Sequence, residues 1–415
     1  MLAPVTASSR PTEGLGDQLQ RSYDQHPRFR FAADAWELEP ERLAAFDAAV
    51  AFVRDRRGAL TRPQFAAWSR RCESALAAVF ESLAGQAADA LEARFVAELH
   101  AECRRVLAED LADYVQPLSA RGVALADPAV QEHALRMDRN ACFFGRLPAD
   151  AVEDILRLGA ADVAIFRERA AQGRCTRDDL SVNAGPSVRQ IARRLNAAFH
   201  ALGVLDAVGA YIGRRMIVGG VSLELSVPQA RWWANAFDGL ARPPATLYAH
   251  LDESIGYPKS IVYLTDVALQ NGPTSCYPRA YRDLQLGLLQ EMIGRVLANV
   301  GNDPASPLKA HYAKAYHQSM TSEPFRRHFM RLPPELRFNS HFGWDVLPDS
   351  AAEHALRARE DVMLGPAGTF IAFDGARLLH RGGMVEQRDR IALQVVFAAS
   401  TLKSRVAGRV RRAVA

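Results

Sequence analysis

The spacing of hydrophobic residues changes about halfway along this chain, and that change constrains the fold more than any other feature. Between about residues 39 and 211 apolar residues recur every three or four positions, as on one face of an α-helix. From residue 212 onward they alternate with polar residues, as in the run Val221, Leu223, Leu225 and Val227, which is the pattern of a half-buried strand. Helices followed by short strands predict an α+β chain, with an all-β core closed as a sandwich or barrel and helices packed outside it.

The helical part carries capping signals that agree with its apolar period. One stripe runs through Phe65, Trp68, Cys72, Leu76, Val79 and Leu83. Thr61 with Gln64 forms a possible capping box before this stripe, and Gly85 follows it. Ser187 with Gln190 predicts the start of a second helix, whose apolar residues extend to Leu202.

Strand candidates and one return to helical spacing divide the second half. Residues 259–268, 368–374 and 390–398 are rich in Ile, Val, Tyr and Phe and are bounded by Gly or Pro. Residues 284–335 again have helical character, so we interpret them as an insertion between two strands. We expect a polar N-terminal segment at 1–38, a helical region packing on the barrel at 39–211, a strand-rich domain at 212–400 and a basic tail at 401–415.

Composition excludes several classes of protein. A hydrophobic fraction of 49% and a formal net charge of +4 over 415 residues are ordinary for a globular protein and indicate no basic groove for nucleic acid. No window approaches eighteen uninterrupted apolar residues, and the first residues lack the apolar stretch of a signal peptide. The five cysteines lie far apart and suggest reduced thiols. We therefore expect a cytoplasmic protein that binds neither nucleic acid nor membrane.

Three residues of the second half form a possible metal-ligand set. Side chains two positions apart in an extended segment point the same way, so His250-Leu251-Asp252 presents an imidazole and a carboxylate on one side. A distal His380 on another strand completes the two imidazoles and one carboxylate that suit an iron(II) site with open positions. The sequence therefore predicts a metal centre at His250, Asp252 and His380.

His-x-Asp alone is a weak signal, because about half of chains of this composition contain it by chance. The order of its neighbours strengthens it: a strand candidate follows, then the turn Asn271-Gly272-Pro273, and His380 stands between the strand candidate 368–374 and Gly382-Gly383. The rival triplet His100-Ala101-Glu102 lies in a helical stretch, where side chains two apart diverge by about 200°. We reject that triplet as a ligand pair.

An arginine ten residues after the distal histidine suggests a second component of the site. The far carboxylate of 2-oxoglutarate needs a planar donor of fixed charge in a dry pocket, and Arg390 opens the last alternating strand with that chemistry. If Arg390 points inward, Ile391, Leu393 and Val395 face outward against covering helices. Arg388 has the same parity and remains the alternative.

These residues resemble a known family in their order and spacing. The series His250-x-Asp252, Tyr263-Leu264-Thr265-Asp266-Val267, Asn271-Gly272-Pro273, His380 and Arg390-Ile391-Ala392-Leu393 is similar to the phytanoyl-CoA dioxygenase family of 2-oxoglutarate oxygenases over about residues 212–400. The resemblance implies a double-stranded β-helix (jelly roll), Fe(II), 2-oxoglutarate, O2 and hydroxylation of a small molecule. The chain departs from the family pattern at Cys276-Tyr277-Pro278-Arg279 and at Gly382.

The expected activity is therefore that of a 2-oxoglutarate-dependent dioxygenase, a hydroxylase that releases succinate and CO2. One alternative is a non-haem iron oxygenase without 2-oxoglutarate, in which Arg390 is a structural ion-pair partner. Another is a non-catalytic jelly-roll protein that binds a small molecule. Arg231 and Trp232 lie about eighteen residues before the first ligand and are candidate substrate contacts. Arg231 is the better candidate, because an arginine is hard to bury without an anionic partner, whereas packing in the core is the alternative for Trp232.

Overall fold

The structure is a computed structural model, which describes residues 34–115, 127–228, 249–252, 256–278, 286–298, 323–338 and 349–400, together with Leu15, Gln18, Leu284 and Val346. Its helices are α2 (Pro40–Asp55), α3 (Arg62–Ala84), α4 (Ala90–Tyr114), α5 (Pro128–Asn140), α6 (Ala149–Ala171), α7 (Pro186–Ala201), α8 (Val204–Ile212), α10 (Leu288–Ala298), α12 (Glu323–Arg331) and α13 (Ala351–Arg357), with a 3-10 turn at Pro334–Leu336. Its strands are β1 (Cys142–Arg146), β2 (Ser181–Val182), β3 (Met216–Ser226), β4 (Lys259–Tyr263), β5 (Ser275–Tyr277), β6 (Asp361–Val362), β7 (Thr369–Phe373), β8 (Leu379–Arg381) and β9 (Arg390–Ala399).

The strands form two antiparallel sheets. The larger has six strands in the order β1-β7-β4-β9-β3-β2, and the smaller has three in the order β6-β5-β8. The longest pairing joins β3 to β9 and brings Ser226 opposite Arg390, with an irregularity between Val218 and Gly220. The expected mixture of helices and antiparallel sheets is therefore present.

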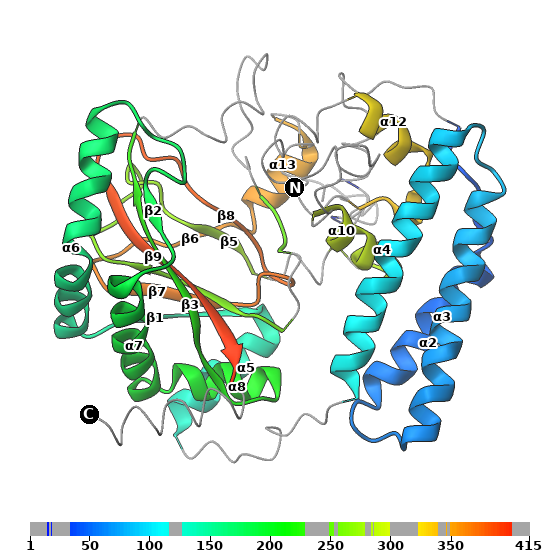
Figure 1. Cartoon of the computed structure of the whole chain (residues 1–415), viewed down its shortest axis with the longest axis horizontal. Coiled ribbons are helices and arrows are strands. Elements are labelled where there is room, and N and C mark those ends of the chain that lie inside the picture. The colour runs from blue at the N-terminus through cyan, green and yellow to red at the C-terminus, as the bar shows by residue number, and fades with distance from the viewer. Residues whose placement is uncertain are drawn as a thin grey trace, which may run out of the picture.

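Helices cover one face of the larger sheet, which we call the helix face (Figure 1). Leu223 and Leu225 of β3 and Leu393 and Val395 of β9 are buried there in one core with residues of α5, α6, α7 and α8. The prediction for the last strand is therefore confirmed: its odd-numbered apolar residues face the helices. The alternate residues of the same strands must point to the opposite face.

The smaller sheet packs on that opposite face, which we call the inner face. Tyr263, Phe373 and Ala392 of the larger sheet share a buried cluster with Cys276 of β5 and with Leu378, the residue before β8. Side chains from both sheets thus fill the space between them.

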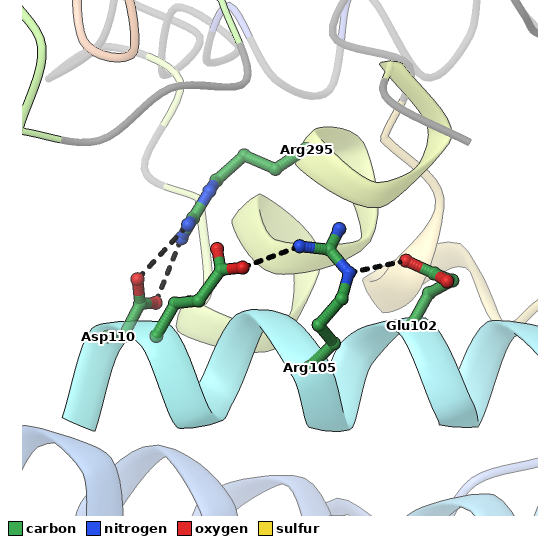
Figure 2. Close-up of polar contacts among 5 residues, drawn as sticks. Glu102, Arg105, Asp110 and Arg295 are labelled. Atoms are coloured by element: carbon green, nitrogen blue, oxygen red, sulfur yellow. Dashed lines mark hydrogen bonds and ion pairs between the residues drawn. The ribbon is translucent and has the colours of Figure 1, made fainter. Parts of the chain in front are cut away.

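The first three helices belong to a separate core. α2, α3 and α4 bury their apolar stripes together with residues of α10, α12 and the 3-10 turn, and no strand residue in the described part of the chain joins this cluster. Figure 2 shows how α10 is attached: Arg295 donates two hydrogen bonds of 2.9 and 3.0 Å to the carboxylate of Asp110 on α4, and both groups are buried. The insertion between strands thus completes a bundle that begins far upstream.

Most expected elements are present, and some differ in detail. Helix α3 has the capping box at Thr61 and Gln64, whereas α7 begins at Pro186, with Gly185 as its N-cap, and not at the expected Ser187 cap. Proline fits the first turn of a helix because its missing N–H has no intrahelical partner there. The strand candidate 259–268 ends already at Tyr263.

Two strands, β1 and β2, fall in the region where we expected helices. They have five and two residues, too short for an alternating pattern to show, and they form through pairing with β7 and β3, which are distant in sequence. Within that region α5–α8 pack on the larger sheet, whereas α2–α4 share their core with α10 and α12. The domain boundaries at 38, 211 and 400 stay predictions.

No single described helix is long and apolar enough to cross a membrane. α7 and α8 together reach that length and hydropathy, but they are bent by 81° at their junction, and their apolar residues lie in the core against the larger sheet.

Candidate metal centre

Backbone pairing brings His250 and His380 side by side. The amide of His250 donates to the carbonyl of His380 at 2.9 Å, and the amide of His380 donates back at 3.0 Å. On its other side His380 pairs with Cys276 of β5. The amide of Asp252 donates to the carbonyl of Gly375 at 2.8 Å, which holds the segment 250–252 extended along β8 and the preceding turn. This register places His250 and Asp252 on the same side, as their spacing predicts.

The three predicted ligands converge. Nε2 of His250 lies 3.8 Å from Oδ1 of Asp252, and Nε2 of His380 lies 3.7 Å from Oδ2. One potential ligand atom from each residue lies within 4.8 Å of the others, and no second group of this kind occurs in the parts of the chain that the structure describes. The ring of His380 also lies 4.8 Å from that of Phe373, so the group sits against the inner face of the larger sheet.

The protonation states suit a cation. Burial lowers the pKa of His380, and its Nδ1 lies 2.9 Å from the carbonyl of Leu378, so Nδ1 carries the proton and Nε2 presents its lone pair to the group. Burial alone would raise the pKa of Asp252, but His380, Lys259 and His250 outweigh it and hold that pKa below its usual range. Because burial keeps His380 neutral, the ammonium of Lys259 is the cation that chiefly keeps the carboxyl group of Asp252 ionised. A neutral imidazole and an ionised carboxylate are what a metal requires.

Asp252 is buried beside a cation. The ammonium of Lys259 lies 2.8 Å from Oδ2 of Asp252 as an ion pair, which offsets part of the cost of burying the carboxylate. Two imidazoles and one ionised carboxylate are a donor set that fits a divalent metal ion.

Gly375 fixes where the carboxylate lies. A Cβ added at Gly375 would meet Oδ2 of Asp252 at 1.8 Å, so any other residue would displace the carboxylate. Tyr211 of α8 donates to the buried carboxylate of the neighbouring Asp374 at 2.7 Å, and Arg377 donates to the same hydroxyl at 2.7 Å. These contacts hold the turn that carries Gly375 and the Leu378 carbonyl. The sequence analysis did not predict these contacts. The pair Asp374-Gly375 at the end of a strand candidate was the signal that could have indicated them.

Arg390 lies on the inner face, where it contacts a carbonyl, a hydroxyl and an aromatic ring. It donates to the carbonyl of Gly272 and, at 3.1 Å, to the hydroxyl of Ser226, and its guanidinium lies 5.9 Å from the centre of the Tyr263 ring. Its buried Nε has no hydrogen-bond partner, and no ion pair joins it to a carboxylate in the described ranges. Arg388 is exposed. Of the two arginines, Arg390 is thus the half-buried one, and the choice between them as the 2-oxoglutarate anchor stays a prediction.

Arg231 and Trp232, the expected substrate contacts, lie outside the described residues. The rejected triplet at His100 does lie within a helix, α4, where His100 stacks on Phe80 at 4.8 Å. Its packing there is consistent with a structural role.

No protein-family model matches the chain, and no curated protein matches it. Several solved structures do: the epimerase SnoN in complex with Fe3+, alpha ketoglutarate and nogalamycin RO is 14% identical, with 66% of this chain and 86% of that chain covered and a TM-score of 0.34. EctD from S. alaskensis with 2-oxoglutarate and 5-hydroxyectoine is 15% identical, with 68% and 80% covered and a TM-score of 0.35. The non-heme monooxygenase ThoJ is 15% identical, with 64% and 76% covered and a TM-score of 0.31. All three likenesses lie at 15% identity or less and at TM-scores of 0.35 or less.

Proposed function

We propose that the protein is an Fe(II)- and 2-oxoglutarate-dependent dioxygenase that hydroxylates a small molecule and releases succinate and CO2. His250, Asp252 and His380 would hold the iron, and Arg390 would bind the far carboxylate of 2-oxoglutarate. The observation that carries the proposal is the convergence of the three ligand atoms within 4.8 Å on the inner face that also bears Arg390. Iron and 2-oxoglutarate together would supply activation of O2.

Each residue has a task that its surroundings support. Asp252 offers an ionised carboxylate, positioned by the contact with Gly375. His380 offers Nε2 because the Leu378 carbonyl holds the proton on Nδ1. Arg390 offers a planar fork that is half-buried and already oriented by Gly272 and Ser226, so less conformational freedom is lost when an anion binds.

The same proposal includes the finer fold. Two antiparallel sheets face each other across the cluster of Tyr263, Phe373 and Cys276, and the ligands lie at the edge of the smaller sheet. This arrangement supports a double-stranded β-helix at 212–400 with a helical insertion at 284–335, as the family resemblance implies. A cytoplasmic location and the tail at 401–415 stay predictions from the sequence.

A second candidate is an iron oxygenase that does not use 2-oxoglutarate. It is favoured by the two hydrogen bonds of Arg390 to Gly272 and Ser226, which would give the arginine a structural task. The metal residues would be the same. The two candidates differ in whether 2-oxoglutarate binds next to the metal.

Anaerobic spectroscopy separates them. The full chain is purified without metal, Fe(II) and then 2-oxoglutarate are added without oxygen, and the visible charge-transfer band of the iron complex is followed. After oxygen is admitted, succinate is measured. We expect the band and succinate from the parent and from His354→Ala, which removes an exposed histidine outside the triad, and neither from His380→Ala. A parent that binds Fe(II) but shows no band and no succinate would favour the second candidate, and a band retained in His380→Ala would place the metal elsewhere.

A further inference from the structure

A polar strip continues from Arg390 along the inner face of β3 and β9. Glu224 stands opposite Ala392, and Ser222 stands opposite Gln394. Because Leu223 and Leu225 are buried on the helix face, Glu224 and Ser222 must point to the inner face, where the Arg390 side chain meets Ser226. Gln394 is exposed, so this strip opens to solvent.

Arg177 reaches the strip from the loop between α6 and β2. Its Nη2 donates to Oε1 of Gln394 at 3.3 Å and lies 3.6 Å from Oε1 of Glu224. Asp179 holds this loop, since its carboxylate accepts from Arg174 at 2.6 Å and from Thr176 at 2.6 Å. The guanidinium of Arg177 is thus held at the strip by an ordered loop, with its side chain 57% exposed.

The partnership between Arg177 and Glu224 is incomplete. Oε1 of Glu224 is buried and has no hydrogen bond, because 3.6 Å is too long for one. The side chain as a whole is only 17% exposed, so water compensates little. The carboxylate of Glu224 is therefore poorly compensated, and a ligand that brings a positive charge to its exposed part would reduce that penalty.

We propose that Glu224 and Arg177 form the recognition site for the molecule that is oxidised, and that this molecule is a zwitterion. Its ammonium group contacts Glu224, and its carboxylate contacts Arg177. The inference rests on the proposed function for the statement that the bound molecule is the substrate, but not for the statement that a zwitterion binds.

Both charges of the ligand follow from the same geometry. An ammonium group supplies several donors and a positive charge closer than the 3.6 Å contact with Arg177, which a hydroxyl group would not. Once Glu224 pairs with that group, the exposed guanidinium of Arg177 loses its weak partner and presents a fork that matches a carboxylate. Gln394 remains as a neutral acceptor between them.

Binding is measured by isothermal titration of the metal-free full chain. The probes are the common free amino acids and, for each that binds, its N-acetyl and methyl-ester derivatives. We expect at least one amino acid to bind, and both derivatives to bind at least about tenfold more weakly, because each loses one of the two charge contacts. Binding by no amino acid, or equal binding of the derivatives, would overturn the inference.

Variants test the two residues directly. Glu224→Gln and Arg177→Gln are each expected to weaken binding about ten- to a hundredfold. Asp178→Asn removes an exposed negative charge from the same loop and Arg189→Gln an exposed positive charge from α7, and both should bind as the parent does. Parental affinity in both site variants would show that the pair only fastens the loop. Glu224→Gln should not lower the melting temperature, since Oε1 has no hydrogen bond to lose and the poorly compensated charge is removed.

The same amino acids then separate this inference from the proposed function. Added anaerobically to the protein with Fe(II) and 2-oxoglutarate, an amino acid that binds should shift the charge-transfer band in the parent and not in Glu224→Gln. If the charge-transfer band forms but no amino acid binds, only the proposal of a zwitterionic ligand is refuted. An amino acid that binds to a protein without any band refutes the oxygenase and leaves a zwitterion-binding site.

Discussion

The helical bundle and the paired sheets bury charged side chains in different ways. In the bundle Arg295 and Asp110 are buried together and joined by two hydrogen bonds, so the two charges compensate each other. In the sheets Arg390 meets a carbonyl and a hydroxyl, and no ion pair joins it to a carboxylate of the described residues. A guanidinium paired with a carboxylate stabilises the fold, whereas a guanidinium that faces only neutral acceptors is available to bind an anionic ligand.

The largest expected effect follows from removing a metal ligand. His250→Ala, Asp252→Ala and His380→Ala should each abolish iron-dependent turnover while far-ultraviolet circular dichroism stays unchanged, because ligands at an open site contribute more to chemistry than to packing. Turnover is measured as succinate released per protein. Full activity in any two of the three variants would refute the assignment.

Breaking the matched pair should act on stability instead. Asp110→Ala leaves the Arg295 guanidinium buried without its carboxylate, and we expect the free energy of unfolding to fall by about 3–5 kcal/mol in urea titrations. The double variant Asp110→Leu/Arg295→Met should lose less, since no charge is left unpaired. Glu102→Ala, which breaks the nearby surface pair with Arg105 (Figure 2), should cost no more than about 1 kcal/mol. Equal losses in the single and double variants would contradict this reading of the pair.

Arg390→Ala should act on the cosubstrate and spare the metal. We expect 2-oxoglutarate affinity to fall by about 2–5 kcal/mol, a factor of roughly thirty to several thousand, because the anion is left without its donor. Arg390→Lys should restore part of it, since a point charge cannot reproduce a bidentate contact. The anaerobic charge-transfer band reports the affinity, and Arg388→Ala is the matched control. Loss of the band in Arg388→Ala but not in Arg390→Ala would reverse the choice between the arginines.

A smaller effect is expected at Gly375. Gly375→Ala places a methyl group where Oδ2 of Asp252 lies, so the carboxylate must turn and Fe(II) affinity should fall about ten- to a hundredfold. Gly382→Ala is the control, because a Cβ there meets nothing within 4 Å. Equilibrium competition with a chelator measures both, and equal affinities would show that the contact does not position Asp252.

The smallest effect concerns a half-buried histidine of the bundle, His100. Burial, with a contribution from Arg104, lowers the pKa of His100. The unfolded chain therefore takes up a proton near pH 6.5 that the folded chain does not, so stability is full above that pH and falls as the pH drops below it. His100→Phe should reduce the difference in unfolding free energy between pH 8 and pH 5.5, and substitution of the exposed His200 should not. An unchanged difference in His100→Phe would contradict the assignment.

The spacing of apolar residues and short-range chemistry predicted the parts of the fold and of the candidate site that depend on residues close in sequence. The α3 capping box, the parity of β9 and the side shared by His250 and Asp252 all follow from spacings of a few positions. Lys259 beside Asp252, Gly375 behind it and Arg177 near Glu224 depend on contacts between distant segments. Contacts of this kind leave no pattern in the local sequence. The five-residue strand β1 likewise depends on pairing with the distant strand β7.

The shared core of the bundle also bears on how the protein is made. Its buried residues come from two stretches, one ending at Leu111 and the other beginning at Leu289. At about 5–20 residues per second, a ribosome needs roughly 10–35 s to synthesise the chain between them. During that interval the apolar stripes of α2, α3 and α4 have left the ribosome without the helix that covers them. Chaperones that bind nascent chains would therefore be expected to meet this segment first, and a slowed codon stretch before Leu289 would lengthen its exposure.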